Sequence, residues 1–78
     1  MKIRLRLYGN IGEYGNGKIA NDGTVTLLDG VTLNELCDFL QLPEKYGKIF
    51  LVNGQPHTKE FMLKDGYEVK VFSLLAGG

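Results

Sequence analysis

Residues 31–40 read Val-Thr-Leu-Asn-Glu-Leu-Cys-Asp-Phe-Leu, and this stretch decides the fold. Thr32 and Glu35 match a capping box, in which the threonine hydroxyl and the glutamate carboxylate each bind a free backbone N–H at the start of a helix. Behind this cap, apolar residues recur at helical spacing at Leu33, Leu36, Cys37 and Leu40, and Phe39 widens the stripe. Proline at position 43 disfavours helical backbone at the residue before it, so the helix should end near residue 40 or 41.

Two strands are predicted before this helix. Residues 2–8 alternate strictly, with three aliphatic residues on one face and three basic residues on the other, as in a half-buried strand. After an Asp-Gly turn, residues 24–28 are rich in β-forming residues and place Val25 and Leu27 on one face. We expect a hairpin whose long, mobile connection is the glycine-rich segment 9–17, pinned by Ile11 or Tyr14.

The part after the helix predicts three more strands. Residues 48–52 form a strong strand pattern, and Asn53-Gly54 is a strong hairpin signal. Residues 55–58 should return as an edge strand, because proline at position 56 cannot donate a ladder hydrogen bond. Residues 61–63 are expected to tuck under the domain, and Asp65-Gly66 turns the chain into a last strand at 67–72.

This order predicts an α+β protein with a ββαββ plan and one short extra strand. We expect a mixed sheet of four to five strands with one main helix packed on one face and the first strand beside the last. That is the β-grasp, or ubiquitin-like, arrangement, and a fold alone does not specify function. Residues 1–74 are predicted to form the β-grasp domain, and residues 75–78 a flexible diglycine tail.

Composition narrows the function classes. The chain has 78 residues, enough for one domain, and its nine basic and nine acidic residues cancel. A neutral chain gives no electrostatic reason to expect nucleic acid or a membrane as partner, and its apolar runs are too short to span a bilayer. We therefore predict a cytoplasmic, monomeric binding or carrier module and no enzyme.

Cys37 and His57 are each the sole residue of their kind, which argues against a metal site. Cys37 lies on the apolar stripe of the helix and is interpreted as a buried structural thiol. His57 is interpreted as an exposed loop residue. No metal and no bound cofactor are expected.

The end of the chain carries the strongest functional signal. On the last strand Val69 and Val71 should face the core, which leaves Phe72 and Leu74 on the other face. These two residues are either covered by loops or form an exposed apolar patch of the kind that binds partners. The chain then ends at Gly77-Gly78, a pair that can enter a narrow channel because glycine has no Cβ.

Four segments in this order resemble the MoaD/ThiS group of ubiquitin-like sulfur carriers. They are residues 31–36 at the helix start, 51–54 at the hairpin, 63–66 before the last strand, and the terminal Gly77-Gly78. The chain departs from the group at Tyr67, where an acidic residue is common. It also departs at residues 73–76, where the molybdopterin branch often has a proline.

The resemblance implies a sulfur carrier that is a substrate rather than a catalyst. A partner enzyme that uses ATP and magnesium would adenylate the Gly78 carboxylate, and a sulfur donor would convert it to a thiocarboxylate. Gly77 would allow the narrow approach, and the docking residues would be Phe72, Leu74, Leu75 and Ala76. The resemblance favours molybdopterin over thiamine as the product, which adds the large subunit of molybdopterin synthase as a possible partner. The alternatives are a protein modifier conjugated through Gly78 and a non-covalent β-grasp interaction module.

Overall fold

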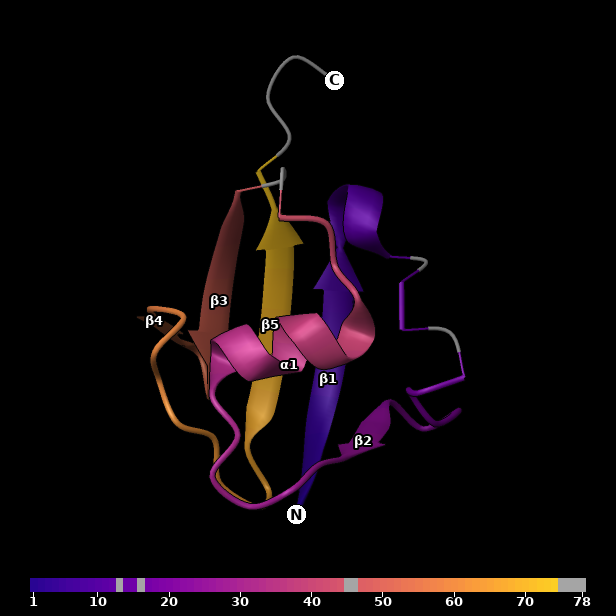
Figure 1. The fold of residues 1–78 in the computed structure, drawn as a ribbon, viewed down its shortest axis with the longest axis vertical. Helices are drawn as coiled ribbons and strands as arrows, with labels where there is room; N and C mark the ends of the chain where they lie inside the picture. Colours follow the sequence, from indigo (N-terminus) through magenta and orange to yellow (C-terminus); the bar gives the residue numbers. More distant parts are fainter. Residues whose placement is uncertain (13, 16, 45–46, 75–78) are drawn as a thin grey trace.

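The computed structural model describes residues 1–12, 14–15, 17–44 and 47–74. It shows one mixed sheet with a single α-helix packed across one face (Figure 1). In chain order the elements are β1 (Lys2–Tyr8), a 3₁₀ turn η1 (Gly9–Ile11), β2 (Thr24–Thr26), α1 (Leu33–Leu40), β3 (Lys48–Val52), β4 (Gln55–His57) and β5 (Glu68–Ser73).

The five strands lie in the order β2-β1-β5-β3-β4. β1 pairs antiparallel with β2 and parallel with β5, while β3 pairs antiparallel with both β4 and β5. The predicted placement of the first strand beside the last is confirmed, and so is the α+β, β-grasp fold. The result is a central β5 that is hydrogen-bonded on both sides.

The helix begins at the predicted capping box. The backbone N–H of Glu35 donates to the Thr32 hydroxyl at 3.2 Å, and the backbone N–H of Thr32 donates to the Glu35 carboxylate at 2.9 Å. The helix ends at Leu40, where Gln41 takes a left-handed conformation with φ 58° and its N–H bonds back to the last turn. Both predicted helix boundaries are therefore confirmed.

Replacing Thr32 with alanine removes the cap hydroxyl and leaves the Glu35 N–H without its side-chain acceptor. We expect Thr32→Ala to lower the free energy of unfolding by about 1 kcal/mol. Urea unfolding followed by circular dichroism measures this change, with Thr58→Ala, an exposed threonine outside the cap, as the matched control. Equal stability of the two variants would contradict the role of the capping box.

The core lies between α1 and the covered face of the sheet. Its most fully buried side chains come from the strands, the helix and two connecting segments. They are Ile3, Ile11, Val25, Leu33, Leu36, Leu40, Leu63, Val69 and Val71. Ile11 is completely buried in the 3₁₀ turn, and Tyr14 packs against the core. Both residues that were predicted as candidates to anchor the glycine-rich segment therefore contact the core.

Two apolar residues that were expected inside, Phe39 and Met62, lie outside, and a third apolar residue, Leu28, is also exposed. Phe39 is 42% exposed because it lies at the margin of the helix stripe, where the Lys18 ammonium group sits 5.2 Å from its ring. Met62 is 56% exposed, since its neighbour Leu63 points into the core and adjacent side chains in extended chain alternate. Leu28, which was predicted on the face opposite Val25 and Leu27, is 82% exposed and lies beyond β2, which ends at Thr26, two residues earlier than predicted.

The interpretation of His57 as an exposed loop residue is wrong. His57 is the last residue of β4 and is half-buried, with its ring stacked on Phe61 at a centroid distance of 3.8 Å. The ring has an aromatic neighbour because β4 pairs with β3 and brings position 57 to the covered side of the sheet edge, opposite the buried Phe50.

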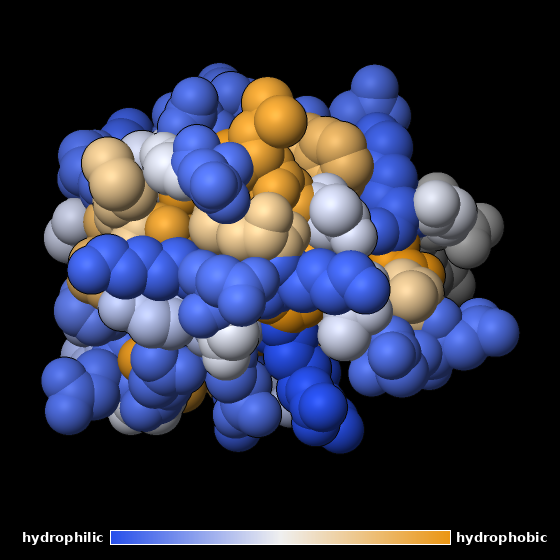
Figure 2. Space-filling model, turned by 90° about the horizontal axis from the view of Figure 1, so that it is seen from below, coloured by the Kyte–Doolittle hydropathy of each residue, from blue (hydrophilic) through white to orange (hydrophobic). Residues whose placement is uncertain are grey.

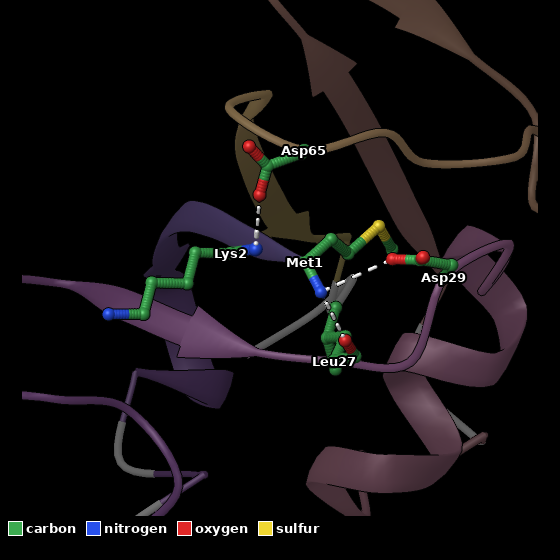
Figure 3. A network of polar contacts seen from close by, with 5 residues as sticks. All are labelled: Met1, Lys2, Leu27, Asp29 and Asp65. Carbon is green, nitrogen blue, oxygen red and sulfur yellow. Dashed lines mark hydrogen bonds and ion pairs between the residues drawn. The ribbon is translucent and has the colours of Figure 1, made fainter.

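A polar network fixes the start of β1 (Figure 3). The Met1 amino group donates to the Leu27 carbonyl at 2.8 Å and pairs with the Asp29 carboxylate at 3.3 Å. The backbone N–H of Lys2 donates to the Asp65 carboxylate at 2.7 Å. These bonds connect β1 to the segment after β2 and to the turn before β5, at the end of the sheet opposite the end of β5 (Figure 1).

Candidate functional site at the end of the central strand

The candidate site is the end of β5, from which the chain continues to its terminal glycines. β5 lies between β1 and β3, and its pairing with both strands extends to Phe72. Beyond the strand, the backbone N–H of Leu74 donates to the Gly47 carbonyl at 2.7 Å. The chain is thus held by the sheet up to residue 74, which fixes the direction in which it leaves the domain.

Two glycines make room for this exit. Gly9 has a φ of +79°, and a Cβ built on it would lie 3.2 Å from the Cβ of Ser73. A Cβ on Gly47 would lie 3.4 Å from the Cβ of Leu74. The Ser73 hydroxyl between them is buried and has no hydrogen-bond partner among the described residues. The backbone around the exit is therefore packed too closely for a larger residue at position 9.

We expect Gly9→Ala to lower the free energy of unfolding by about 1–2 kcal/mol from the left-handed backbone alone. The contact with Ser73 adds to this cost. Gly30→Ala is the matched control, because Gly30 has a similar φ of +84° but nothing within 4 Å of a built Cβ. Urea unfolding should show a larger loss for Gly9→Ala, and a loss no greater than that of Gly30→Ala would disprove the close packing.

Three apolar residues form a row across the open face of the sheet, the face opposite α1. Phe72 on β5 pairs with Tyr8 on β1 and with Ile49 on β3. The rings of Tyr8 and Phe72 stack with centroids 4.6 Å apart and an interplanar angle of 9°. We call Tyr8, Phe72 and Ile49 the open-face row.

The open-face row answers the question that the sequence left open about Phe72 and Leu74. Phe72 is half-buried, since Tyr8 covers one side of its ring, while Ile49 is 43% exposed. Leu74 is 51% exposed and follows the row directly. The two residues expected on the outer face are therefore partly accessible to a partner and lie next to the chain exit.

Basic residues lie next to the open-face row, two residues before Tyr8 on β1 and two residues before Phe72 on β5. Arg6 pairs with Lys70 across β1 and β5, and Arg4 precedes them on β1. None of these three forms an ion pair with a carboxylate of the described residues. Asp22 lies nearby, and the Thr24 hydroxyl and N–H, which donate to its carboxylate at 2.7 and 3.0 Å, lower its pKa. The open face thus combines an apolar row with three basic side chains, and it also carries Glu68, the cross-strand partner of Arg4, with Asp22 close by.

The other titratable candidates do not build a site. Cys37 is buried on the inner face of α1, and this burial raises the pKa of its thiol, which keeps it protonated and unreactive. Among residues 1–12, 14–15, 17–44 and 47–74, no three His, Cys, Asp or Glu side chains gather as a metal site would require. In the same residues no helix is long and apolar enough to cross a membrane.

Only part of the site predicted from the sequence lies within the residues that the structure describes. Phe72 and Leu74 lie where they can contact a partner, whereas Leu75, Ala76, Gly77 and Gly78 lie outside the described residues. The sequence reasoning missed Tyr8 and Ile49. The signal for Tyr8 was present, because its position in the alternation of β1 puts an aromatic ring on the otherwise basic face.

The family model that matches this chain is the ThiS family, over residues 14–78. The chain belongs to the ThiS family. This membership supports the class of ubiquitin-like sulfur carriers, small proteins that are generally non-catalytic and interact with activating enzymes and sulfur-accepting partners.

Among solved structures, this ThiS-family chain is similar to the crystal structure of SAMP1 from Haloferax volcanii. The TM-score is 0.65 with 18% sequence identity, and the match covers 100% of each chain. At this identity the likeness shows the shared fold alone. No curated protein sequence matches the chain.

Proposed function

We propose that this protein is a sulfur carrier that reacts through the carboxylate of Gly78. The observation that carries the proposal is the setting of the chain exit. A central strand, held on both sides, leads directly to a segment that ends in two glycines, beside an accessible apolar row. Membership of the ThiS family supports the same reading.

The chemistry begins with a poor electrophile. A carboxylate resists nucleophiles because it is negatively charged and its oxygen is a poor leaving group. In the proposed first step, a Gly78 carboxylate oxygen attacks the α-phosphorus of ATP, and pyrophosphate leaves. In the second step a hydrosulfide attacks the carbonyl carbon of the adenylate, the new C–S bond forms, and AMP leaves with the C–O electron pair. The product is a thiocarboxylate, and ATP and magnesium are held by the activating enzyme.

The domain supplies position rather than catalytic groups. The four residues 75–78 extend at most about 13–14 Å, so the domain must dock close to the partner's active site. The open-face row and Leu74 offer apolar area for this docking, and the neighbouring Arg4, Arg6 and Lys70 select a partner surface with acidic residues around an apolar centre. Docking converts the meeting of carboxylate and ATP into a reaction within one complex.

The test is the intact mass of the protein after incubation with a cognate activating enzyme, ATP, magnesium and a sulfur source. The proposal predicts a mass gain equal to the replacement of one oxygen by sulfur. Conjugates of higher mass that require Gly78 would support the protein modifier instead. An unchanged mass, with partner binding that survives removal of Gly77-Gly78, would support a non-covalent interaction module.

We take a molybdopterin precursor as the first proposed recipient of the sulfur and a thiamine precursor as the second. The resemblance of the sequence favours the first, while the ThiS family as such is compatible with both. Incubating the thiocarboxylate form with each recipient enzyme and its precursor separates them. Only the true pair returns the carrier to the mass of the carboxylate.

A further inference from the structure

A second surface lies on the other side of the molecule, between α1 and the edge strand β2. Its strand side is lined by Thr26, Leu27, Leu28 and Val31, and its helix side by Glu35, Asp38 and Phe39. The groove has a volume of about 610 Å³, which is within the range of roughly 300–1,000 Å³ typical of ligand sites. We call it the α1–β2 groove.

The α1–β2 groove is apolar where it is most exposed. Leu28 is 82% exposed, the highest value among the large hydrophobic residues that the structure describes, and Phe39 is 42% exposed. Seen from the end where the chain begins, apolar surface gathers on the side of α1, above a band of hydrophilic side chains (Figure 2). Exposed apolar surface with a polar rim is a mark of a binding site.

The strand side of the groove has free backbone groups. Hydrogen bonds alternate along an antiparallel pair, and Leu27 exchanges both of its bonds with Met1, so the N–H and C=O of Thr26 point away from β1. Among the described residues, the backbone groups of Thr26 and Leu28 form no hydrogen bond. At Thr24 the edge is already closed, since its N–H donates to Asp22 and its C=O accepts from Ala20.

The charge of the groove indicates which kind of partner segment can bind there. Glu35 and Asp38 line its helix side, and the exposed Asp29 carboxylate follows Leu28 in the chain. The Met1 amino group compensates Asp29, and Lys18, beside Phe39, donates to the Phe39 carbonyl at 2.7 Å at the far end of the helix. Carboxylates therefore outnumber cations around the groove, and a basic flank on the occupant fits them.

We propose that the α1–β2 groove binds an extended segment of a partner protein that adds a strand to β2. The segment has alternating aliphatic residues, which fill the groove around Leu28 and Phe39, and a lysine or arginine at its flank. Its backbone bonds with the free N–H and C=O groups of Thr26 and Leu28. Because the groove and the open-face row lie on opposite sides of the sheet, the partner can hold the carrier while an enzyme acts on Gly78.

The probe is the synthetic peptide acetyl-Lys-Val-Ile-Val-Ile-Lys-amide, titrated into the ¹⁵N-labelled full chain. We expect a Kd below about 1 mM, with shifts at Thr26, Leu28, Val31 and Phe39 and slower hydrogen exchange of the Thr26 and Leu28 amides. Two matched peptides control for mechanism. N-methylation of alternate amides on the pairing edge should abolish binding, and replacing both lysines with glutamate should weaken it.

The variant Leu28→Ser should weaken peptide binding by about tenfold or more. It should leave the fold intact, because this side chain is almost fully exposed. Ile49→Ser, which alters an exposed aliphatic residue on the opposite face, should leave peptide binding unchanged.

Four outcomes would overturn the proposal. In the titration these are no binding at about 1 mM peptide, chemical-shift changes centred on Tyr8 and Phe72, or equal binding of the N-methylated peptide. The fourth is edge-to-edge pairing of two copies of the chain, detected by sedimentation. A chain with a C-terminal carboxamide should bind the peptide as the natural chain does. Failure of the sulfur-carrier proposal would therefore leave this test unaffected.

Discussion

A chain whose Gly78 carboxylate is replaced by a carboxamide should gain no sulfur in the presence of activating enzyme, ATP, magnesium and a sulfur source. The change keeps the length and the backbone of the tail, and it removes only the oxygen that would attack ATP. Loss of conversion should therefore be complete. Intact mass after a fixed incubation measures it.

Deleting Gly78 gives a second, graded test of the same site. The shortened chain still ends in a glycine carboxylate, now that of Gly77, but this group is displaced by about 3.3–3.6 Å toward the domain. Since a misplacement of about 1 Å can cost 100-fold in rate, we expect conversion to be at least about 100-fold slower. Leu28→Ser, on the other side of the sheet, is the control and should convert normally. Full conversion of either altered tail would contradict the role of Gly78.

The second large effect is expected at Phe72. Replacing it with serine removes the centre of the open-face row and leaves Tyr8 and Ile49 without the ring that joins them. Central aromatic residues of an interface typically account for at least about 2 kcal/mol, so the affinity for the activating enzyme should fall by about 30-fold or more. Isothermal titration calorimetry measures this loss.

The same variant should remain folded. Phe72 is only half-buried, and loss of an aromatic pair costs about 0.5–1.5 kcal/mol beyond buried area. Leu28→Ser is again the matched control, because it removes an exposed apolar residue from the opposite side and should bind the enzyme normally. If Phe72→Ser unfolds the domain, the ring belongs to the core. If it folds and binds with unchanged affinity, the open-face row is not the docking surface.

The features that were predicted correctly from the sequence are local ones. The capping box depends on Thr32 and Glu35, three residues apart, and the β3–β4 turn depends on Asn53-Gly54, both of which take positive φ values as a tight hairpin requires. The buried faces of β1 and β5 follow from strict alternation of side chains. These patterns need no knowledge of the rest of the molecule, and together they were enough for the fold.

The open-face row could not be predicted in the same way. Tyr8, Ile49 and Phe72 are neighbours only because β1 lies parallel to β5 and β3 antiparallel to it, in one particular register. The outward positions of Phe39 and Met62 likewise depend on tertiary packing, since each lies beside core residues in the sequence. The α1–β2 groove required the true end of β2, which left Leu28 beyond the strand.

The two surfaces are proposed to bind two different partners. The open-face row lies beside the chain exit and is proposed to dock the activating enzyme, whereas the α1–β2 groove lies across the sheet and is proposed to bind an extended segment. Phe72→Ser should therefore weaken only the binding of the activating enzyme, and Leu28→Ser only the binding of the peptide. Loss of both interactions in either variant would indicate a shared surface or a damaged fold.

The most direct test of the central claim is fragmentation mass spectrometry of the intact protein after reaction with activating enzyme, ATP, magnesium and a sulfur source. The proposal predicts that the sulfur is found in the smallest C-terminal fragments and is assigned to Gly78, with the remainder of the chain unchanged. Sulfur found on Cys37, or on any residue other than Gly78, would contradict it.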